Sequence, residues 1–190
     1  MIRTDLIEFL KSRISEPRFN HCLGVEAMAS KLAKRFDVDP EKASIAALLH
    51  DVCREVSPDL LLKLAVKFDI LISNIEQTEP ILLHGFVGAA IVKQELNIID
   101  PMILEAISYH ITGAAHISPL AQLIFIADFI EPGRQFERAR ILREEAFSLK
   151  PDQLLLKVYN HTINYVVNQG YLIHPLSVEG RNEIIMKGVN

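Results

Sequence analysis

Apolar side chains recur along the chain at the spacing of helix faces, three or four residues apart. Two stripes show this most clearly: Leu6, Phe9, Leu10 and Ile14, followed by His21, Val25, Met28 and Leu32. The same pattern predicts further helices over 40–52, 58–68, 81–96, 101–111, 119–130, 136–148, 152–169 and 178–187. No convincing alternation of apolar and polar residues indicates a strand, so the sequence predicts an all-α fold.

Proline marks the start of several of these helices. Four prolines follow a residue whose side chain can cap a helix, in the pairs Asp39-Pro40, Ser57-Pro58, Asp100-Pro101 and Ser118-Pro119. The nine prolines lie roughly twenty residues apart, but the segments between them do not resemble one another, which argues against an internal repeat. No linker rich in glycine or serine divides the chain, and we expect one compact helical domain.

Composition narrows the class of function. The chain has 190 residues, of which 49% are hydrophobic and 23% charged, enough for a sizeable core in about one domain. Twenty basic against 24 acidic residues give a net charge of −4, which argues against nucleic acid or an anionic membrane held by bulk positive charge. Seven histidines with no tryptophan and two cysteines favour metal or proton chemistry over redox chemistry.

The sequence also indicates where in the cell the protein is expected to act. The first residues mix charges with apolar side chains and contain no apolar core of a secretory signal, so we expect a cytoplasmic protein. The longest stretch without a formal charge, 111–127, is too short and too polar to span a membrane. Cys22 and Cys53 have no redox or zinc spacing and are expected to be free, buried thiols.

Four residues, at three places in the sequence, would put polar groups into apolar surroundings, which is energetically costly. His50 and Asp51 end a strongly apolar helix, Asp128 lies among large apolar residues in 123–130, and His21 lies on the apolar stripe of the second helix. Each has a structural alternative, such as a hydrogen-bonded core histidine. A buried carboxylate is nevertheless unfavourable unless it is paired or bound to a cation. One divalent metal held by two histidines and two aspartates would account for all of them, and this ligand set suits iron, manganese or zinc.

Three more residues are candidates for contacts around such a metal. His84 lies near a helix start and His110 at a helix end, although each could simply be a half-exposed terminal histidine. Arg134 follows the Asp128 helix and could direct a guanidinium at phosphate, although an arginine in a loop is often only solvated.

Longer motifs surround these residues in a fixed order. They are Leu48-Leu-His-Asp-Val52, Leu82-Leu-His-Gly85, Tyr109-His-Ile-Thr-Gly113, Ile126-Ala-Asp-Phe-Ile-Glu-Pro-Gly-Arg134 and Gly170-Tyr-Leu-Ile-His-Pro175. Together with His21 they resemble the bacterial symmetrical bis(5′-nucleosyl)-tetraphosphatases, the YqeK-type family of the HD metal-dependent phosphohydrolase superfamily. The resemblance covers about residues 18–182, and the correspondence fades after Asn182.

The resemblance implies a single HD-type helical domain over 1–190, with a core at about 18–135 and C-terminal helices 136–190 closing over the site. It implies a divalent metal, preferably iron, with manganese or another ion as alternatives. The reaction implied is cleavage of diadenosine tetraphosphate into two ADP by attack of a metal-activated water on phosphorus. The partner would be a small dinucleoside polyphosphate or nucleotide, and a homodimer is one assembly to consider.

The resemblance also assigns roles to residues. The metal ligands it implies are His21, His50, Asp51 and Asp128. The catalytic residues would be Asp51, His84 and His110, with Asp51 orienting the water and the histidines stabilising charge. Substrate contacts would come from Gly24, His84, His110, Thr112, Arg134, His174 and Arg181. His116 and His161 receive no chemistry.

Other functions stay open on the sequence alone. The same ligands could serve an HD-type 5′-nucleotidase, another nucleotide phosphohydrolase or a cyclic-dinucleotide phosphodiesterase. A nucleotide-binding module without turnover and a metal-free helical interaction protein are alternatives outside the enzymes. The number of metal ions is also open, because His84 and His110 could either complete a second metal site or contact phosphate.

Overall fold

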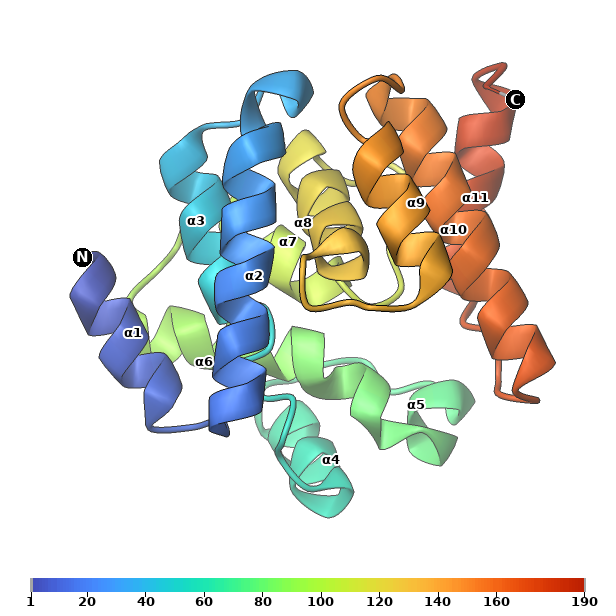
Figure 1. Cartoon of the computed structure of the whole chain (residues 1–190). Helices are drawn as coiled ribbons and strands as arrows, with labels where there is room; N and C mark the ends of the chain where they lie inside the picture. Colours follow the sequence, from blue (N-terminus) through green and yellow to red (C-terminus); the bar gives the residue numbers. More distant parts are fainter. Residues whose placement is uncertain (1, 190) are drawn as a thin grey trace.

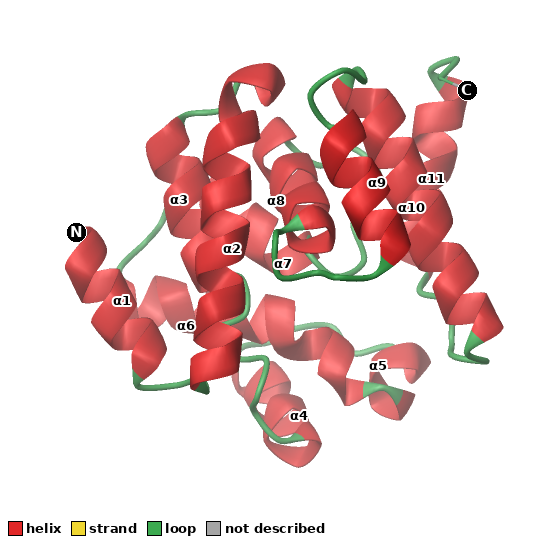
Figure 2. Ribbon diagram, in the orientation of Figure 1, coloured by secondary structure: helices red, strands yellow, loops and turns green. Residues whose placement is uncertain are grey.

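Every regular element of the computed structural model is helical over the residues it describes, 2–189. Eleven α-helices and two 3-10 helices occur in this range, and the predicted all-α fold is confirmed (Figure 2). In chain order they are α1 (Arg3–Lys11), α2 (Glu16–Leu32), η1 (Ala33–Phe36), α3 (Pro40–Leu49), α4 (Pro58–Lys67), α5 (Asn74–Thr78), η2 (Pro80–Leu83), α6 (His84–Leu96), α7 (Pro101–Tyr109), α8 (Pro119–Ile130), α9 (Glu137–Glu145), α10 (Pro151–Asn168) and α11 (Pro175–Met186).

Side-chain caps explain why helices begin where the prolines predict. The side chains of Asp39, Asp100 and Ser118 each accept a backbone N–H from the first turn of α3, α7 and α8. The proline that follows each cap needs no hydrogen-bond acceptor for its nitrogen and has its φ angle already set for a helix. Ser57 precedes α4 in the same way but makes no side-chain cap bond.

Among the helices that are shorter than predicted, two end at a histidine, whereas the helix predicted over 136–148 spans only Glu137–Glu145. The helix predicted over 40–52 ends at Leu49, and the one predicted over 101–111 ends at Tyr109. In both cases the Nδ1–H of the next residue, His50 or His110, donates to the carbonyl three residues earlier. That carbonyl would accept a backbone N–H if the helix continued, so the imidazole takes the place of the helical bond.

Other boundaries differ for local reasons. The segment predicted as one helix over 81–96 is split between η2 and α6, and the last helix begins at Pro175 and not at 178. The short elements η1 and α5 were not predicted. An element of four or five residues is too short to carry a recognisable periodic stripe, and α5 depends on a capping box at Ser73 and Glu76.

Helix α8 is the centre of the packing. It contacts α2, α3 and α7 on one side and α9 and α10 on the other, and it buries apolar residues around most of its circumference. In Figure 1, α1 and α11 lie at opposite ends of the molecule, α6 passes behind the lower half of α2, and α4 and α5 lie below α6. A side chain near the end of α8 therefore lies between the N-terminal helices and the C-terminal group α9–α11.

Two further expectations concern the cysteines and the membrane. Cys22 and Cys53 are free and buried as predicted, and burial raises the pKa of Cys53 to about 12. Within 2–189, the structure has no helix that combines the length and the apolar character needed to cross a membrane.

Candidate metal centre

Three histidines at helix ends carry the same hydrogen bond. The Nδ1–H groups of His50, His84 and His110 donate to the carbonyls of the residues three positions earlier, at 2.6, 2.6 and 2.7 Å. A carbonyl can only accept, so Nδ1 carries the proton and Nε2 of the neutral ring keeps its lone pair. Burial lowers the pKa of His50 to about 4 and also lowers that of His84, which keeps both rings neutral.

His21 is oriented by a carboxylate and not by a backbone carbonyl. It lies on α2, and its Nδ1–H donates to Glu131 Oε1 at 3.1 Å. Its Nε2 lies 3.0 Å from Asp128 Oδ1. Burial opposes the charged ring, but hydrogen bonds to Asp128 and Glu131 outweigh it and raise the pKa of His21 to about 9. A cation that binds at Nε2 must therefore displace a proton.

Gly24 makes room for this carboxylate. It lies one turn after His21 on α2, and a β-carbon there would collide with the carboxylate of Glu131. The backbone N–H of Gly133 donates to the other oxygen of Glu131, at 2.5 Å. Glu131 is thus fixed by its own loop and aimed at the His21 ring.

Asp51 lies between two pairs of histidines. Its Oδ2 is 3.5 Å from His50 Nε2 and 3.7 Å from His21 Nε2. Its Oδ1 is 3.0 Å from His84 Nε2 and 3.4 Å from His110 Nε2.

The imidazole nitrogens face each other within each pair. The Nε2 atoms of His21 and His50 are 3.3 Å apart, and those of His84 and His110 are 3.1 Å apart. Two lone pairs repel at such a distance unless a proton or a cation lies between them. Two groups have ligand atoms close enough to share an ion: His21, His50 and Asp51, and Asp51, His84 and His110. Neutral imidazole and carboxylate donors suit a divalent transition metal, so the residues fit the predicted group.

The four residues predicted as ligands lie together in this structure. Asp128 joins the first group through its 3.0 Å contact with His21, while His84 and His110 lie across Asp51. Asp51 could therefore ligate ions on both sides, one through each oxygen.

Two arginines neutralise the carboxylates. Arg134 donates to Asp128 Oδ1 at 2.7 Å, and Arg18 donates to Asp51 Oδ2 at 2.8 Å. Arg18 was not predicted, although it lies three residues before His21 and thus on the same face of α2. Both guanidinium groups bring positive charge to the site of a protein whose net charge is −4.

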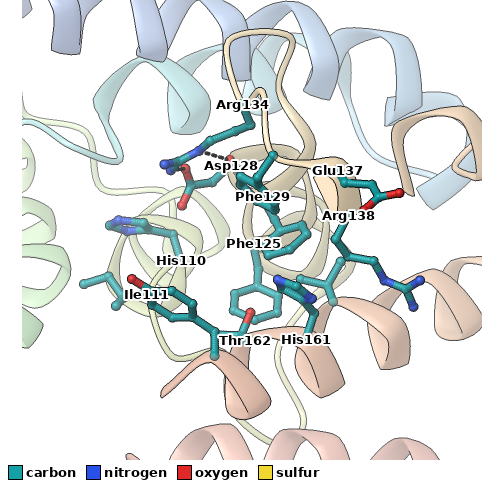
Figure 3. A pocket seen from close by; sticks show the side chains of 13 residues that line it. His110, Ile111, Phe125, Asp128, Phe129, Arg134, Glu137, Arg138, His161 and Thr162 are labelled. Carbon is teal, nitrogen blue, oxygen red and sulfur yellow. Dashed lines mark hydrogen bonds and ion pairs between the residues drawn. The ribbon is translucent and has the colours of Figure 1, made fainter. Parts of the chain in front are cut away.

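A cavity of about 730 Å³ opens beside the centre. His110, Asp128 and Arg134 form part of its wall, and the rest comes from Ile111 after α7 and from α8, α9, α10 and the loop before α9 (Figure 3). Arg143 of α9 holds this loop by donating to the carbonyls of Ile130, Glu131 and Arg134 at 2.6–2.7 Å.

The geometry agrees with comparisons to known proteins. Residues 18–133 match the model of the HD domain family. The chain belongs to this family. A symmetrical bis(5′-nucleosyl)-tetraphosphatase of Halalkalibacterium halodurans is 32% identical to it over 98% of this chain and 99% of that protein. A protein of the same description from Staphylococcus aureus is 31% identical over 90% and 89% of the two chains.

A solved HD structure shows the same fold. An HD superfamily hydrolase of Clostridium acetobutylicum, described as involved in NAD metabolism, superposes with a TM-score of 0.93 over 98% of both chains at 32% identity. The family resemblance read from the sequence motifs is confirmed by these matches.

Three residues predicted to contact substrate are bonded within the HD protein itself. The Thr112 hydroxyl donates to the carbonyl of Gly113. His174 caps α11 through Nδ1 and donates from Nε2 to Glu76 at 2.7 Å. Arg181 donates to Asn160 of α10 at 2.5 Å. Their substrate contacts stay predictions, and none of the three is among the residues that line the cavity beside the metal centre.

Proposed function

We propose that this HD protein hydrolyses diadenosine tetraphosphate symmetrically and releases two molecules of ADP. The observation that carries the proposal is the cluster around the Asp51 carboxylate. It brings together the Nε2 atoms of four histidines and, through His21, the carboxylate of Asp128. Proteins named for this reaction match the chain over almost their full length, which supports the choice of substrate.

The proposed ligands of the ion are His21, His50, Asp51 and Asp128, and iron is the metal that we propose, with manganese as a substitute. A divalent ion bound there supplies positive charge for a phosphoryl oxygen and lowers the pKa of a coordinated water. The remaining steps belong to the protein. Asp51 is positioned to orient the water, since its carboxylate lies between both pairs of histidines.

Charge on the polyphosphate is handled by the residues around this centre. Arg134 and Arg18 offer guanidinium groups that can turn from Asp128 and Asp51 to phosphate once an ion neutralises the carboxylates. We assign His84 and His110 to stabilising negative charge on the leaving phosphate. ADP is a good leaving group, so an obligatory proton donor is not needed.

We further propose that residues 1–190 act as one HD domain, with a core at 18–135 and helices 136–190 closing over the site. The cavity supports this, because α9 and α10 supply the wall opposite His110 and Asp128. We expect the protein to act in the cytoplasm on a small dinucleoside polyphosphate and not on nucleic acid. We also propose that it can form a homodimer, which light scattering would test.

Anaerobic purification followed by metal and product analysis tests the reaction. The protein should contain iron and convert diadenosine tetraphosphate to ADP alone. The Asp51→Ala variant should lose both metal and turnover, because Asp51 lies in both ligand groups. The His110→Ala variant should keep metal bound at His21, His50, Asp51 and Asp128 and lose rate.

The alternatives give different outcomes. ATP plus AMP among the products would contradict symmetrical cleavage. Preferential turnover of a nucleoside monophosphate or a cyclic dinucleotide would indicate another HD phosphohydrolase. An active, metal-free Asp51→Ala protein would refute the metal mechanism.

A further inference from the structure

The cavity beside the metal centre has two chemically different ends. In Figure 3, His110, Asp128 and Arg134 lie on one side, and His161 lies on the other with the rings of Phe125 and Phe129 between them. The first end is continuous with the ligand groups, whereas the side of His161 carries aromatic rings together with the charged Glu137 and Arg138. The whole cavity, at about 730 Å³, falls within the range of small-molecule sites, which is roughly 300–1,000 Å³.

The rings of Phe129, Phe136 and His161 form an aromatic wall of the cavity that begins beside Asp128. Phe129 meets Phe136 and His161 edge to face, with ring centroids 5.2 and 5.1 Å apart. Phe136 and His161 are nearly parallel, at 10° with centroids 5.9 Å apart. Phe136 is 42% exposed, which leaves much of a large apolar ring uncovered beside the cavity.

His161 contributes to this wall as a neutral ring. It received no role from the sequence, and α10 presents it to the cavity. Partial burial and the nearby Arg138 lower the pKa of His161, so the imidazole is uncharged at neutral pH. A neutral imidazole offers a flat π face, as phenylalanine does.

The chain links the two ends through a short loop. Arg134 and Phe136 are two residues apart between α8 and α9, and Phe129 directly follows Asp128 on α8. Two residues of extended chain span at most about 7 Å. A group bound to Arg134 and a group stacked on Phe136 can therefore belong to one small ligand that is phosphate at one end and flat and aromatic at the other.

From this geometry we propose that the wall of Phe129, Phe136 and His161 is a subsite for the purine base of one nucleoside half of the substrate. The subsite rests on the proposed function for the identity of its ligand. In this arrangement the phosphates of the nucleotide point towards Arg134 and the metal centre, and its base stacks on the exposed ring of Phe136. Aromatic stacking binds any purine, so adenine and guanine nucleotides should both be accepted.

Binding of two probes to the manganese-loaded protein tests the subsite. ADP carries base and phosphate, whereas inorganic tripolyphosphate carries phosphate alone. The Phe136→Leu variant should weaken ADP binding about tenfold, the loss expected for one stacked base, and should leave tripolyphosphate binding unchanged. Phe136→Tyr keeps an aromatic ring and should restore most of the ADP affinity. Phe147→Leu is the matched control, because Phe147 is a half-exposed phenylalanine outside the cavity.

The outcomes separate this subsite from the proposed reaction. Unchanged ADP binding in Phe136→Leu would overturn the subsite even if the protein cleaves diadenosine tetraphosphate. Equal losses for ADP and tripolyphosphate would also overturn it, since they would indicate a disturbed loop. If the wild-type protein fails to cleave diadenosine tetraphosphate but ADP binding alone still depends on the aromatic ring at 136, the reaction is refuted and the base subsite stands.

Discussion

At the scale of single residues, the metal centre depends on which nitrogen of each imidazole carries the proton. His50, His84 and His110 are each fixed by a backbone carbonyl, and His21 is fixed by Glu131. A bond from Nδ1–H sets the ring orientation and leaves Nε2 for an ion. The three backbone bonds come from helix ends, so they need no partner distant in the sequence.

His21 differs from the other three histidines because its partner is a side chain, Glu131, that is distant in the sequence. Removing the charge of Glu131 should therefore weaken metal binding. Glu131→Gln keeps the volume but removes the charge that His21 faces at 3.1 Å. We expect metal affinity to fall about tenfold or more, the usual effect of losing a carboxylate behind a metal-bound histidine. Titration with manganese measures the affinity, and excess manganese should recover activity.

The control is Glu144→Gln on α9, whose side chain is 70% exposed. It should bind manganese as the wild type does. Wild-type affinity in Glu131→Gln would show that the His21 ring is held without this carboxylate.

The sequence predicted some of these residues and not others for a physical reason. His21, His50, Asp51 and Asp128 could be singled out because burying such a group is costly wherever the chain goes next. Glu131 lies 110 residues from His21, and its role appears only when α2 and α8 pack together. The signal for it in hindsight is Gly24, where only a residue without a side chain leaves room for the carboxylate.

At the scale of elements, the helices were largely predictable and their ends less so. Proline with a capping side chain located the starts of α3, α7 and α8. The ends of α3 and α7 depend on histidine side chains that bond back to the helix, which no periodic pattern reveals. Two of the helix ends that the sequence did not locate thus carry residues of the site.

The pair Glu76 and His174 joins two elements that lie far apart in the sequence, α5 and the start of α11. Glu76 accepts from His174 Nε2 at 2.7 Å and from Ser73 at the cap of α5. Burial opposes the charge of Glu76, but the bonds from Ser73 and His174 outweigh it and lower its pKa from 4.5 to about 2. The folded state therefore favours the ionised carboxylate more than the unfolded chain does.

The free energy of unfolding should therefore depend on pH. A depressed carboxyl pKa stabilises the fold above the unfolded pKa, and that contribution disappears as the pH falls from about 4.5 towards 2. Glu76→Gln should reduce the free energy of unfolding by about 1.5–3 kcal/mol at pH 7, the range for a hydrogen bond to a charged group. Urea denaturation of both proteins at several pH values measures the difference.

The difference between wild type and Glu76→Gln should be constant above pH 5 and shrink below pH 4.5. A difference that stays constant down to pH 2.5 would assign the loss to packing and not to the charge. Glu144→Gln, exposed on α9, should show no comparable difference at any pH.

At the scale of the whole molecule, the all-α fold class was predictable from the sequence, and so was a cluster of histidines and aspartates able to hold a metal, but the cavity was not. The net charge of −4 excludes binding by bulk positive charge, and Arg18 and Arg134 reverse the sign locally. The cavity forms where α8, α9, α10 and the loop between α8 and α9 meet. Phe129, Phe136 and His161 read as ordinary core or surface residues in the sequence, because only tertiary packing brings their rings together.

Because the proposed ligands His21, His50, Asp51 and Asp128 come from α2, the end of α3 and α8, an ion bound among them should stabilise the packing of these helices and with it the fold. An ion that binds only the folded state adds about 2.7 kcal/mol at a hundredfold excess over its dissociation constant. For a protein of this size the gain corresponds to a rise in Tm of roughly 5–10 °C. Thermal unfolding with EDTA and then with excess manganese measures it.

Two variants make this measurement specific to the metal centre. His116→Ala removes a histidine that is 86% exposed and paired with Glu183, and it should keep the full rise in Tm. Asp51→Ala removes the residue shared by both ligand groups and should abolish most of the rise. Equal rises in both variants would mean that manganese stabilises the protein from another site, because Asp51 belongs to both groups of ligand atoms.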